Sequence, residues 1–258
     1  MGVLPQRFGG ISLARFFVDP QDIKGDTAII TGPDVKHISK VLRMGNGDRL
    51  TILDGRGLVF TAEITGMTKD EVTCHLLGPE VAPAEPNLKV TLVQGLPKGD
   101  KMETIIQKCT ELGIYQIIPL AAARSVVRLD GKKAAERQQR WQRVAMEAAK
   151  QCRRPVIPRV QKLCQLTEVI SMIPTNALGV IAWEDEKQQS LRQLLQGVTM
   201  PEEIYIFIGP EGGFDPEEVA RLSQRGWPNV TLGPRILRTE TAGPTALTMV
   251  LYHYGELG

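Results

Sequence analysis

The stretch IYIFIGPEGGFDPEEVARLSQRG, residues 204–226, contains the pattern that decides the fold. It opens with five consecutive apolar residues, 204–208, which is typical of a strand buried on both faces of a sheet. Asp215 and Pro216 then supply a helix N-cap and a proline at the first helical position, and Gly226 predicts the helix end. A buried strand, a short loop and a capped helix form the repeating unit of a parallel α/β sheet.

The same alternation runs from about residue 88 to the end of the chain. Further apolar runs predict strands over residues 88–94, 117–120, 178–183 and 230–232. Amphipathic spacing predicts helices over residues 101–112, 134–152 and 244–254. The first of these has a capping-box spacing in Asp100 and Glu103, and Pro244 is predicted to open the last. We therefore expect an α/β fold with a parallel sheet in residues 88–258.

Residues 1–80 show a different pattern, with many short β-rich runs and one helix. Strands are predicted over residues 14–18, 49–53, 58–64 and 72–77. The helix is predicted over residues 35–44, with four apolar side chains on one buried face: Val35, Ile38, Val41 and Leu42. This composition favours a small β-barrel. Residues 78–87, with Pro79, Pro83 and Pro86, predict an extended linker after it.

Length and composition bound the class of protein. The chain has 258 residues, of which 42% are hydrophobic and 23% charged, as in soluble globular proteins of one or two domains. No apolar run approaches the length of a membrane span, and residues 1–10 lack the apolar core of a signal peptide. The four cysteines have no CxxC spacing and suggest reduced thiols. We expect a cytoplasmic protein that does not bind membranes.

The positive charge is concentrated in the middle of the chain. Residues 98–162 hold 15 Lys/Arg against 6 Asp/Glu, whereas residues 163–258 hold 6 against 12. Such a basic segment predicts a polyanionic partner, with nucleic acid the first candidate, although a solvated helix without a partner is the alternative. The candidate phosphate contacts in it are Arg124, Arg128, Lys132, Lys133, Arg137, Arg140, Arg153 and Arg154.

Two loops at predicted strand ends are candidates for a ligand site, because parallel α/β sheets bind ligands at the carboxyl ends of their strands. They are residues 209–214, GPEGGF, and residues 232–241, LGPRILRTET. Neither has the spacing of a phosphate loop or a dinucleotide fingerprint, and no GxSxG motif occurs. The three histidines lack neighbours for a metal site, so no metal is expected. Glycines that merely permit a tight turn are the alternative to a binding site.

Both loops resemble the signature motifs of the RsmE family, the bacterial methyltransferases of uracil N3 in small-subunit ribosomal RNA. Supporting pieces follow in the family's order: His37-Ile38, Gly95-Leu96-Pro97-Lys98, residues 108–113 (KCTELG) and Arg140-Trp141. The resemblance covers essentially the whole chain. Ala242-Gly243-Pro244 departs from it, because the family usually continues here with apolar helix formers.

The resemblance implies a protein of the SPOUT superfamily. Residues 1–80 would form a PUA-like β-barrel that helps to hold RNA, and residues 88–258 a SPOUT domain with a deep trefoil knot. The implied cofactor is S-adenosyl-L-methionine, the substrate is 16S rRNA of the 30S subunit, and the protein would be a homodimer. The implied cofactor loops are the one after residues 178–183, residues 209–213 and residues 232–238. The implied cofactor-binding residues are Trp183, Gly209, Pro210, Gly212, Gly213, Leu232, Gly233, Ile236, Leu237 and Arg238.

The proposed chemistry requires a group that handles the proton of uracil N3, which is not nucleophilic until that proton leaves. Arg238 could stabilise the anionic base, and Glu240 could orient Arg238 or accept the proton, with Glu211 the second carboxylate candidate. A structural ion pair of Arg238 and Glu240 is the alternative. The RNA contacts expected from charge and from the resemblance are Arg15, Arg43, Lys98, Lys101, Arg124, Arg153 and Arg154.

Two other functions fit the sequence. One is a non-catalytic RNA-binding or ribosome-assembly factor, which would not need intact cofactor loops. The other is a related SPOUT enzyme that methylates a ribose hydroxyl or guanine. The sequence leaves open which group is the general base and whether naked rRNA or the assembled subunit is the substrate.

Overall fold

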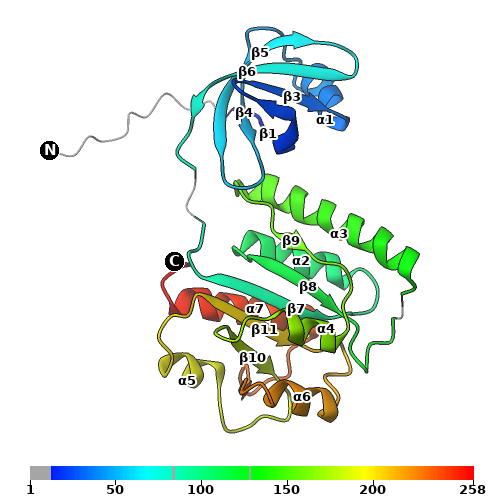
Figure 1. The fold of residues 1–258 in the computed structure, drawn as a ribbon, viewed down its shortest axis with the longest axis vertical. Coiled ribbons are helices and arrows are strands. Elements are labelled where there is room, and N and C mark those ends of the chain that lie inside the picture. Colours follow the sequence, from blue (N-terminus) through cyan, green and yellow to red (C-terminus); the bar gives the residue numbers. More distant parts are fainter. Residues whose placement is uncertain (1–12, 83–84, 128) are drawn as a thin grey trace, which may run out of the picture. The chain divides into compact units, whose positions relative to one another are not determined.

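The computed structural model describes residues 13–82, 85–127 and 129–258 and divides into two units, Met1–Pro83 and Ala84–Gly258 (Figure 1). Three features named above lie outside the described ranges: residues 1–10, considered for a signal peptide, Pro83 of the predicted linker and Arg128 of the basic segment. No helix in the described part of the chain combines the length and apolar character of a membrane span.

The N-terminal unit is built on a curled six-stranded sheet with the order β1-β4-β5-β6-β3-β2 (Figure 1). Its strands are β1 Arg15–Phe17, β2 Ile23–Lys24, β3 Thr27–Thr31, β4 Arg49–Leu53, β5 Val59–Met67 and β6 Glu71–Pro79. β1 pairs with β4 in parallel, and the other neighbours are antiparallel. The four predicted strands are confirmed, whereas β2 and β3 were missed. A short 3-10 turn, Pro20–Asp22, precedes β2.

The predicted helix over residues 35–44 is wrong in its second half. The segment forms α1, Pro33–Lys36, followed by a π-helical turn, His37–Val41. Ile38 is buried as predicted, but Val41 is 67% and Leu42 39% exposed. The physical reason is the wider turn: Leu42 N–H donates to the His37 carbonyl, five residues back, at 2.9 Å. A π-turn rotates later side chains away from the face that an α-helical spacing of three or four assigns to them.

The C-terminal unit contains a six-stranded sheet with the order β12-β10-β11-β7-β8-β9, in which every pairing is parallel. Its strands are β7 Lys89–Gly95, β8 Gln116–Leu120, β9 Arg159–Val160, β10 Leu178–Ala182, β11 Glu203–Ile208 and β12 Asn229–Val230. Its helices are α2 Lys101–Glu111, α3 Gly131–Cys152, α4 Leu166–Met172, α5 Leu191–Gln196, α6 Pro216–Ser223 and α7 Thr239–His253. The predicted parallel α/β fold is confirmed.

Helices cover both faces of this sheet (Figure 1). One apolar cluster joins side chains of α2, α3, α5 and α7 to residues such as Val90, Leu92 and Ile206. A second cluster joins α4 and α6 to alternate residues of the same strands, including Val93 and Phe207. Successive side chains of a strand point to opposite faces, so this division explains why the strands are continuous apolar runs.

The helix ends confirm one cap prediction and overturn two expectations. Asp215 caps α6 by accepting a hydrogen bond from Glu217 N–H at 3.0 Å, as predicted. Asp100 makes no side-chain cap at α2, because its backbone, at φ −96° and ψ 10°, is not in the extended conformation of an N-cap. The side chain of Glu103, the predicted reciprocal partner, pairs with Arg140 Nε at 2.8 Å. The last helix begins at Thr239, so Pro244 lies inside it and not at its start.

Candidate functional site

A cavity of about 690 Å³ opens at the carboxyl ends of β10, β11 and β12. Three loops line it: residues 183–187, 208–214 and 231–239. The site lies where parallel α/β sheets place their ligands, and its volume is within the roughly 300–1,000 Å³ of small-molecule pockets. The two glycine-containing loops expected to form the site are therefore brought together.

Close packing of the main chain explains the glycines of residues 209–213. A Cβ atom on Gly209 would lie 2.8 Å from the carbonyl carbon of Gly213. Gly213 has φ +68°, and a Cβ there would lie 2.9 Å from Glu184 Oε1. Both positions exclude a side chain, so the turn presents bare backbone to the cavity.

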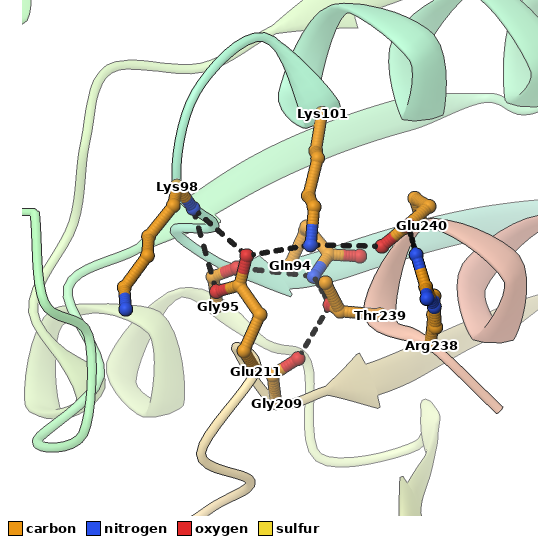
Figure 2. Close-up of polar contacts among 9 residues, drawn as sticks. All are labelled: Gln94, Gly95, Lys98, Lys101, Gly209, Glu211, Arg238, Thr239 and Glu240. Carbon is orange, nitrogen blue, oxygen red and sulfur yellow. Dashed lines mark hydrogen bonds and ion pairs between the residues drawn. The ribbon is translucent and has the colours of Figure 1, made fainter. Parts of the chain in front are cut away.

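Lys101, at the start of α2, lies between two carboxylates of the site (Figure 2). Its Nζ is 2.9 Å from Glu211 Oε1 and 3.4 Å from Glu240 Oε2. Glu211 also accepts a hydrogen bond from the backbone N–H of Lys98 at 3.1 Å. These contacts join three segments that are far apart in the sequence: the loop before α2, the glycine loop and the first turn of α7.

The ion pair holds both of its members in their charged forms. The hydrogen bond to Glu211 is the main cause that raises the pKa of Lys101 above its ordinary value. Partial burial alone would raise the pKa of Glu211, but the hydrogen bonds from Lys101 and Lys98 outweigh it and lower that pKa. Near neutral pH the pair is therefore an ammonium and a carboxylate.

Arg238 and Glu240 lie close together at the start of α7, and of the two only Arg238 lines the cavity (Figure 2). The Arg238 side chain is 83% exposed, and its Nη1 lies 4.0 Å from Glu240 Oε1. The Glu240 side chain is 21% exposed. Its Oε2 is buried and accepts no hydrogen bond from the described residues, although Lys101 lies nearby. Glu240 is thus paired with Lys101 through one carboxylate oxygen and, at a longer distance, with Arg238 through the other.

Most residues expected to bind the cofactor line this cavity. The structure places nine of the ten there: Trp183, Gly209, Pro210, Gly213, Leu232, Gly233, Ile236, Leu237 and Arg238. Gly212 points elsewhere, with its carbonyl accepting a hydrogen bond from Arg124 Nη1 at 3.2 Å. The charged residues Glu184, Glu186 and Lys187 also line the cavity. They were not predicted individually, but they belong to the loop after residues 178–183, which the resemblance implies as a cofactor loop. Their position directly after a predicted strand was the available signal.

Comparisons with known proteins identify the family of this chain. A family model described as an RNA methyltransferase domain matches residues 84–251, and one described as an RNA methyltransferase PUA domain matches residues 30–77. The ribosomal RNA small subunit methyltransferase E of Bacillus subtilis (strain 168) is 37% identical over 247 residues, covering 93% of this chain and 96% of that protein.

The chain belongs to the RsmE family. Another RsmE protein, from Synechocystis sp., is 32% identical and matches 92% of this chain and 76% of its own length. Among solved structures, the RsmE of Neisseria gonorrhoeae bound to S-adenosyl methionine superposes with a TM-score of 0.81. That match has 32% identity and covers 93% of this chain and 97% of the other.

The residues expected to bind RNA in this RsmE protein are divided between the N-terminal and the C-terminal unit. Arg15, in β1, and Arg43, after the π-turn, belong to the N-terminal unit. In the C-terminal unit, the Lys98 and Arg153 side chains are exposed. Arg124 Nη1 donates a hydrogen bond to the Gly212 carbonyl of the glycine loop, and Arg124 Nε lies 3.5 Å from Asp215 Oδ2. Lys101 lies in the cavity itself, as described above.

Arg154 is a correction to that set. Only 9% of the residue is exposed, and its Nη1 donates to the Thr110 carbonyl at 2.9 Å. Its Nε lies 3.1 Å from Glu85 Oε1. A guanidinium that is buried and already paired offers no surface to a phosphate, so Arg154 stabilises the fold of this RsmE protein. Its sequence neighbour Arg153, the left-handed C-cap of α3, stays exposed.

The described residues contain no group of three or more His, Cys, Asp or Glu side chains arranged to hold a metal ion.

Proposed function

We propose that this protein methylates N3 of a uridine in 16S rRNA of the small ribosomal subunit, with S-adenosyl-L-methionine as methyl donor. The observation that carries the proposal is the cavity in which the two glycine-containing loops meet Lys101 and Arg238, with Glu240 paired to both of these side chains from outside the lining. Membership of the RsmE family supports the reaction class, and the donor-bound Neisseria structure supports the choice of donor.

The residues present fit the donor. The bare backbone of residues 209–213 allows a ligand to approach closely, and residues 231–238 with Trp183 supply a second wall. The lining carries side chains of both signs, which suits a donor that has cationic groups and a carboxylate. The acidic ones are Glu184, Glu186 and Glu211, and the basic ones are Lys101, Lys187, Arg235 and Arg238. Bound S-adenosyl-L-methionine would supply a methyl group activated by its positively charged sulfur. The protein's own task is to align the acceptor and manage its proton.

Glu240 is the side chain that we propose to accept the N3 proton. Its carboxylate does not itself line the cavity, but it lies directly beside Lys101 and Arg238, which do. Lys101 keeps that carboxylate in place through the 3.4 Å ion pair. Arg238, which is largely exposed and lines the cavity, would stabilise the negative charge that develops on the uracil.

Glu211 is less suited to be the base. Its lowered pKa makes it a weak proton acceptor, and hydrogen bonds from Lys98 and Lys101 already occupy it. We therefore propose that Glu211 positions Lys101 and the glycine loop, and that Lys101 acts in the cavity and not as a phosphate contact.

The substrate must present an unpaired or flipped-out uridine, because N3 lies on the pairing edge of the base. We propose that Arg124, Arg153 and Lys98 contact its backbone in the C-terminal unit, with Arg15 and Arg43 from the N-terminal unit. The match to an RNA methyltransferase PUA domain supports an RNA-holding role for residues 1–80, and residues 88–258 would be the catalytic domain. The family resemblance further supports a homodimer, a deep trefoil knot and a cytoplasmic location.

The experiment that tests this proposal compares the modified nucleosides of 16S rRNA between strains. A strain without the gene should lack N3-methyluridine, detected by mass spectrometry, and the wild-type protein should restore it. Arg238→Ala should not restore it, whereas Arg192→Ala, an exposed arginine on α5 outside the cavity, should. Loss of a ribose-methylated or guanine-methylated nucleoside instead would identify a different SPOUT reaction. An unchanged nucleoside profile would favour an assembly factor.

A further inference from the structure

Gln94 is a buried polar residue in an otherwise apolar strand face. It lies near the end of β7, is 0% exposed, and shares its side of the sheet with Val90 and Leu92. Burying an amide without compensating hydrogen bonds costs about 1–3 kcal/mol, which an apolar residue here would avoid. The contacts of this amide therefore indicate what the residue does.

Both amide hydrogens of Gln94 are used, and one begins a chain of hydrogen bonds (Figure 2). Nε2 donates to the Gly95 carbonyl at 3.0 Å and to Thr239 Oγ1 at 2.8 Å. The Thr239 hydroxyl in turn donates to the Gly209 carbonyl at 2.7 Å. Gly209 is the first residue of the glycine loop, and Thr239 is the first residue of α7. The chain thus joins β7 to both walls of the cavity.

Tight backbone packing fixes the position of this amide. A Cβ atom on Gly95 would lie 2.5 Å from Pro210 Cδ, so the end of β7 touches the glycine loop directly. A Cβ on Gly243 would lie 3.3 Å from Gln94 Oε1 and 3.1 Å from Leu92 Cδ2, so α7 packs closely on the other side. The side chain is held between two segments that both contribute to the cavity.

We infer that Gln94 is a positioning residue that sets the spacing between the glycine loop and the first turn of α7. It acts through Thr239 and has no need to touch donor or RNA. Because binding geometry in such sites is sensitive to shifts of about 1 Å, loss of the amide should weaken donor binding. It should leave RNA affinity unchanged, since the proposed phosphate contacts lie elsewhere. This inference rests on the proposed donor site.

The experiment measures the affinity of purified full-length variants for S-adenosyl-L-methionine by calorimetry. Gln94→Leu, which keeps the size of the side chain, should weaken binding about tenfold or more, as should Thr239→Val. The double variant should bind the donor no more weakly than either single variant, because both substitutions break the same series of hydrogen bonds. Thr239→Ser, which keeps the hydroxyl, should recover most of the affinity lost in Thr239→Val. RNA binding, measured by gel shift, should not change.

The matched control is Thr110→Val. Thr110 is 0% exposed and donates a hydroxyl hydrogen bond to the Ile106 carbonyl at 2.7 Å within α2, so its loss lowers Tm through the same kind of contact. Its donor affinity should equal that of the wild type.

Unchanged donor affinity in Gln94→Leu, or additive losses of affinity in the double variant, would overturn the inference. If Gln94→Leu does not fold, equal affinities of Thr239→Val and Thr239→Ser overturn it. Wild-type protein that binds no donor would instead overturn the proposed function.

Discussion

Lys101 Nζ lies 2.9 Å from Glu211 Oε1, and this contact joins the start of α2 to the glycine loop (Figure 2). The same ammonium reaches Glu240 at the start of α7. One lysine therefore bridges two segments that line the cavity and that are 29 positions apart in the sequence. Its position explains why a residue expected to contact RNA is better placed to organise the donor site.

Removing this bridge should weaken donor binding. Lys101→Met keeps the length of the side chain without its charge, and we expect S-adenosyl-L-methionine affinity to fall about tenfold. Glu211→Gln should lower the affinity by a similar factor. In the double variant the affinity should fall by less than the product of the two single factors, because both substitutions break one ion pair. Calorimetry measures all three. Lys98→Met is the control, because Glu211 uses only the backbone N–H of Lys98, and its donor affinity should not change.

The same ion pair predicts how the free energy of unfolding depends on pH. The pKa of Glu211 is lowered in the folded protein, so its contribution is complete above the ordinary value of 4.5 and is lost as pH falls through the lowered pKa. The pKa of Lys101 is raised, so its contribution is complete below 10.5 and is lost only as pH rises through the raised pKa. The contribution should therefore be constant between these limits. Urea denaturation over a range of pH checks this. In Glu211→Gln the free energy of unfolding should fall less at acidic pH than in the wild type. The same fall in both proteins would contradict the ion pair of Glu211 with Lys101.

The adjacent residues Arg153 and Arg154 should separate RNA binding from stability. Arg154→Ala leaves Glu85 without its buried partner and should lower the free energy of unfolding by about 3 kcal/mol, measured by urea denaturation. Arg153→Ala should change stability by less than about 0.5 kcal/mol. It should weaken RNA binding and reduce the salt dependence of affinity by about one unit of slope. Equal stability of the two variants would contradict the burial of Arg154.

Gly95 and Gly131 offer a matched pair of glycine substitutions. Gly95→Ala forces a methyl group to within 2.5 Å of Pro210 Cδ, so the glycine loop must move and donor binding should be lost. Gly131→Ala, at the first position of α3, meets no atom within 4 Å and should stabilise the protein by up to about 1 kcal/mol. Thermal unfolding and calorimetry on both variants provide the check. Donor binding by Gly95→Ala at wild-type affinity would show that the close approach does not shape the site.

Local sequence patterns predicted the fold where local forces decide it. Asp215 and Glu218 form the expected capping box of α6 because both partners belong to one helix turn. Asp100 and Glu103 have the same spacing, but Arg140, from another helix, takes Glu103. A contact between residues 37 positions apart cannot be read from the pattern of one helix start.

In the candidate site, too, the sequence predicted what local patterns determine and missed what depends on contacts between distant residues. Nearly all cofactor residues follow from two loops at strand ends, since parallel topology alone brings such loops together. Gln94 was missed because it ends an apolar run and its partners, Thr239 and Gly209, are distant in sequence. Arg154 was assigned to RNA by charge, whereas only the fold places it against Glu85. Pro244 inside α7 was missed because proline is expected at the first turn of a helix.

The most direct test of the central claim uses purified protein, S-adenosyl-L-methionine with an isotope-labelled methyl group, and small subunits from a strain that lacks the gene. The labelled rRNA is digested and its nucleosides are separated by mass spectrometry. We expect one labelled product, N3-methyluridine, with the wild-type protein and no labelled product with Arg238→Ala. Label in a ribose-methylated or guanine-methylated nucleoside, or no label with protein that binds the donor, would contradict it.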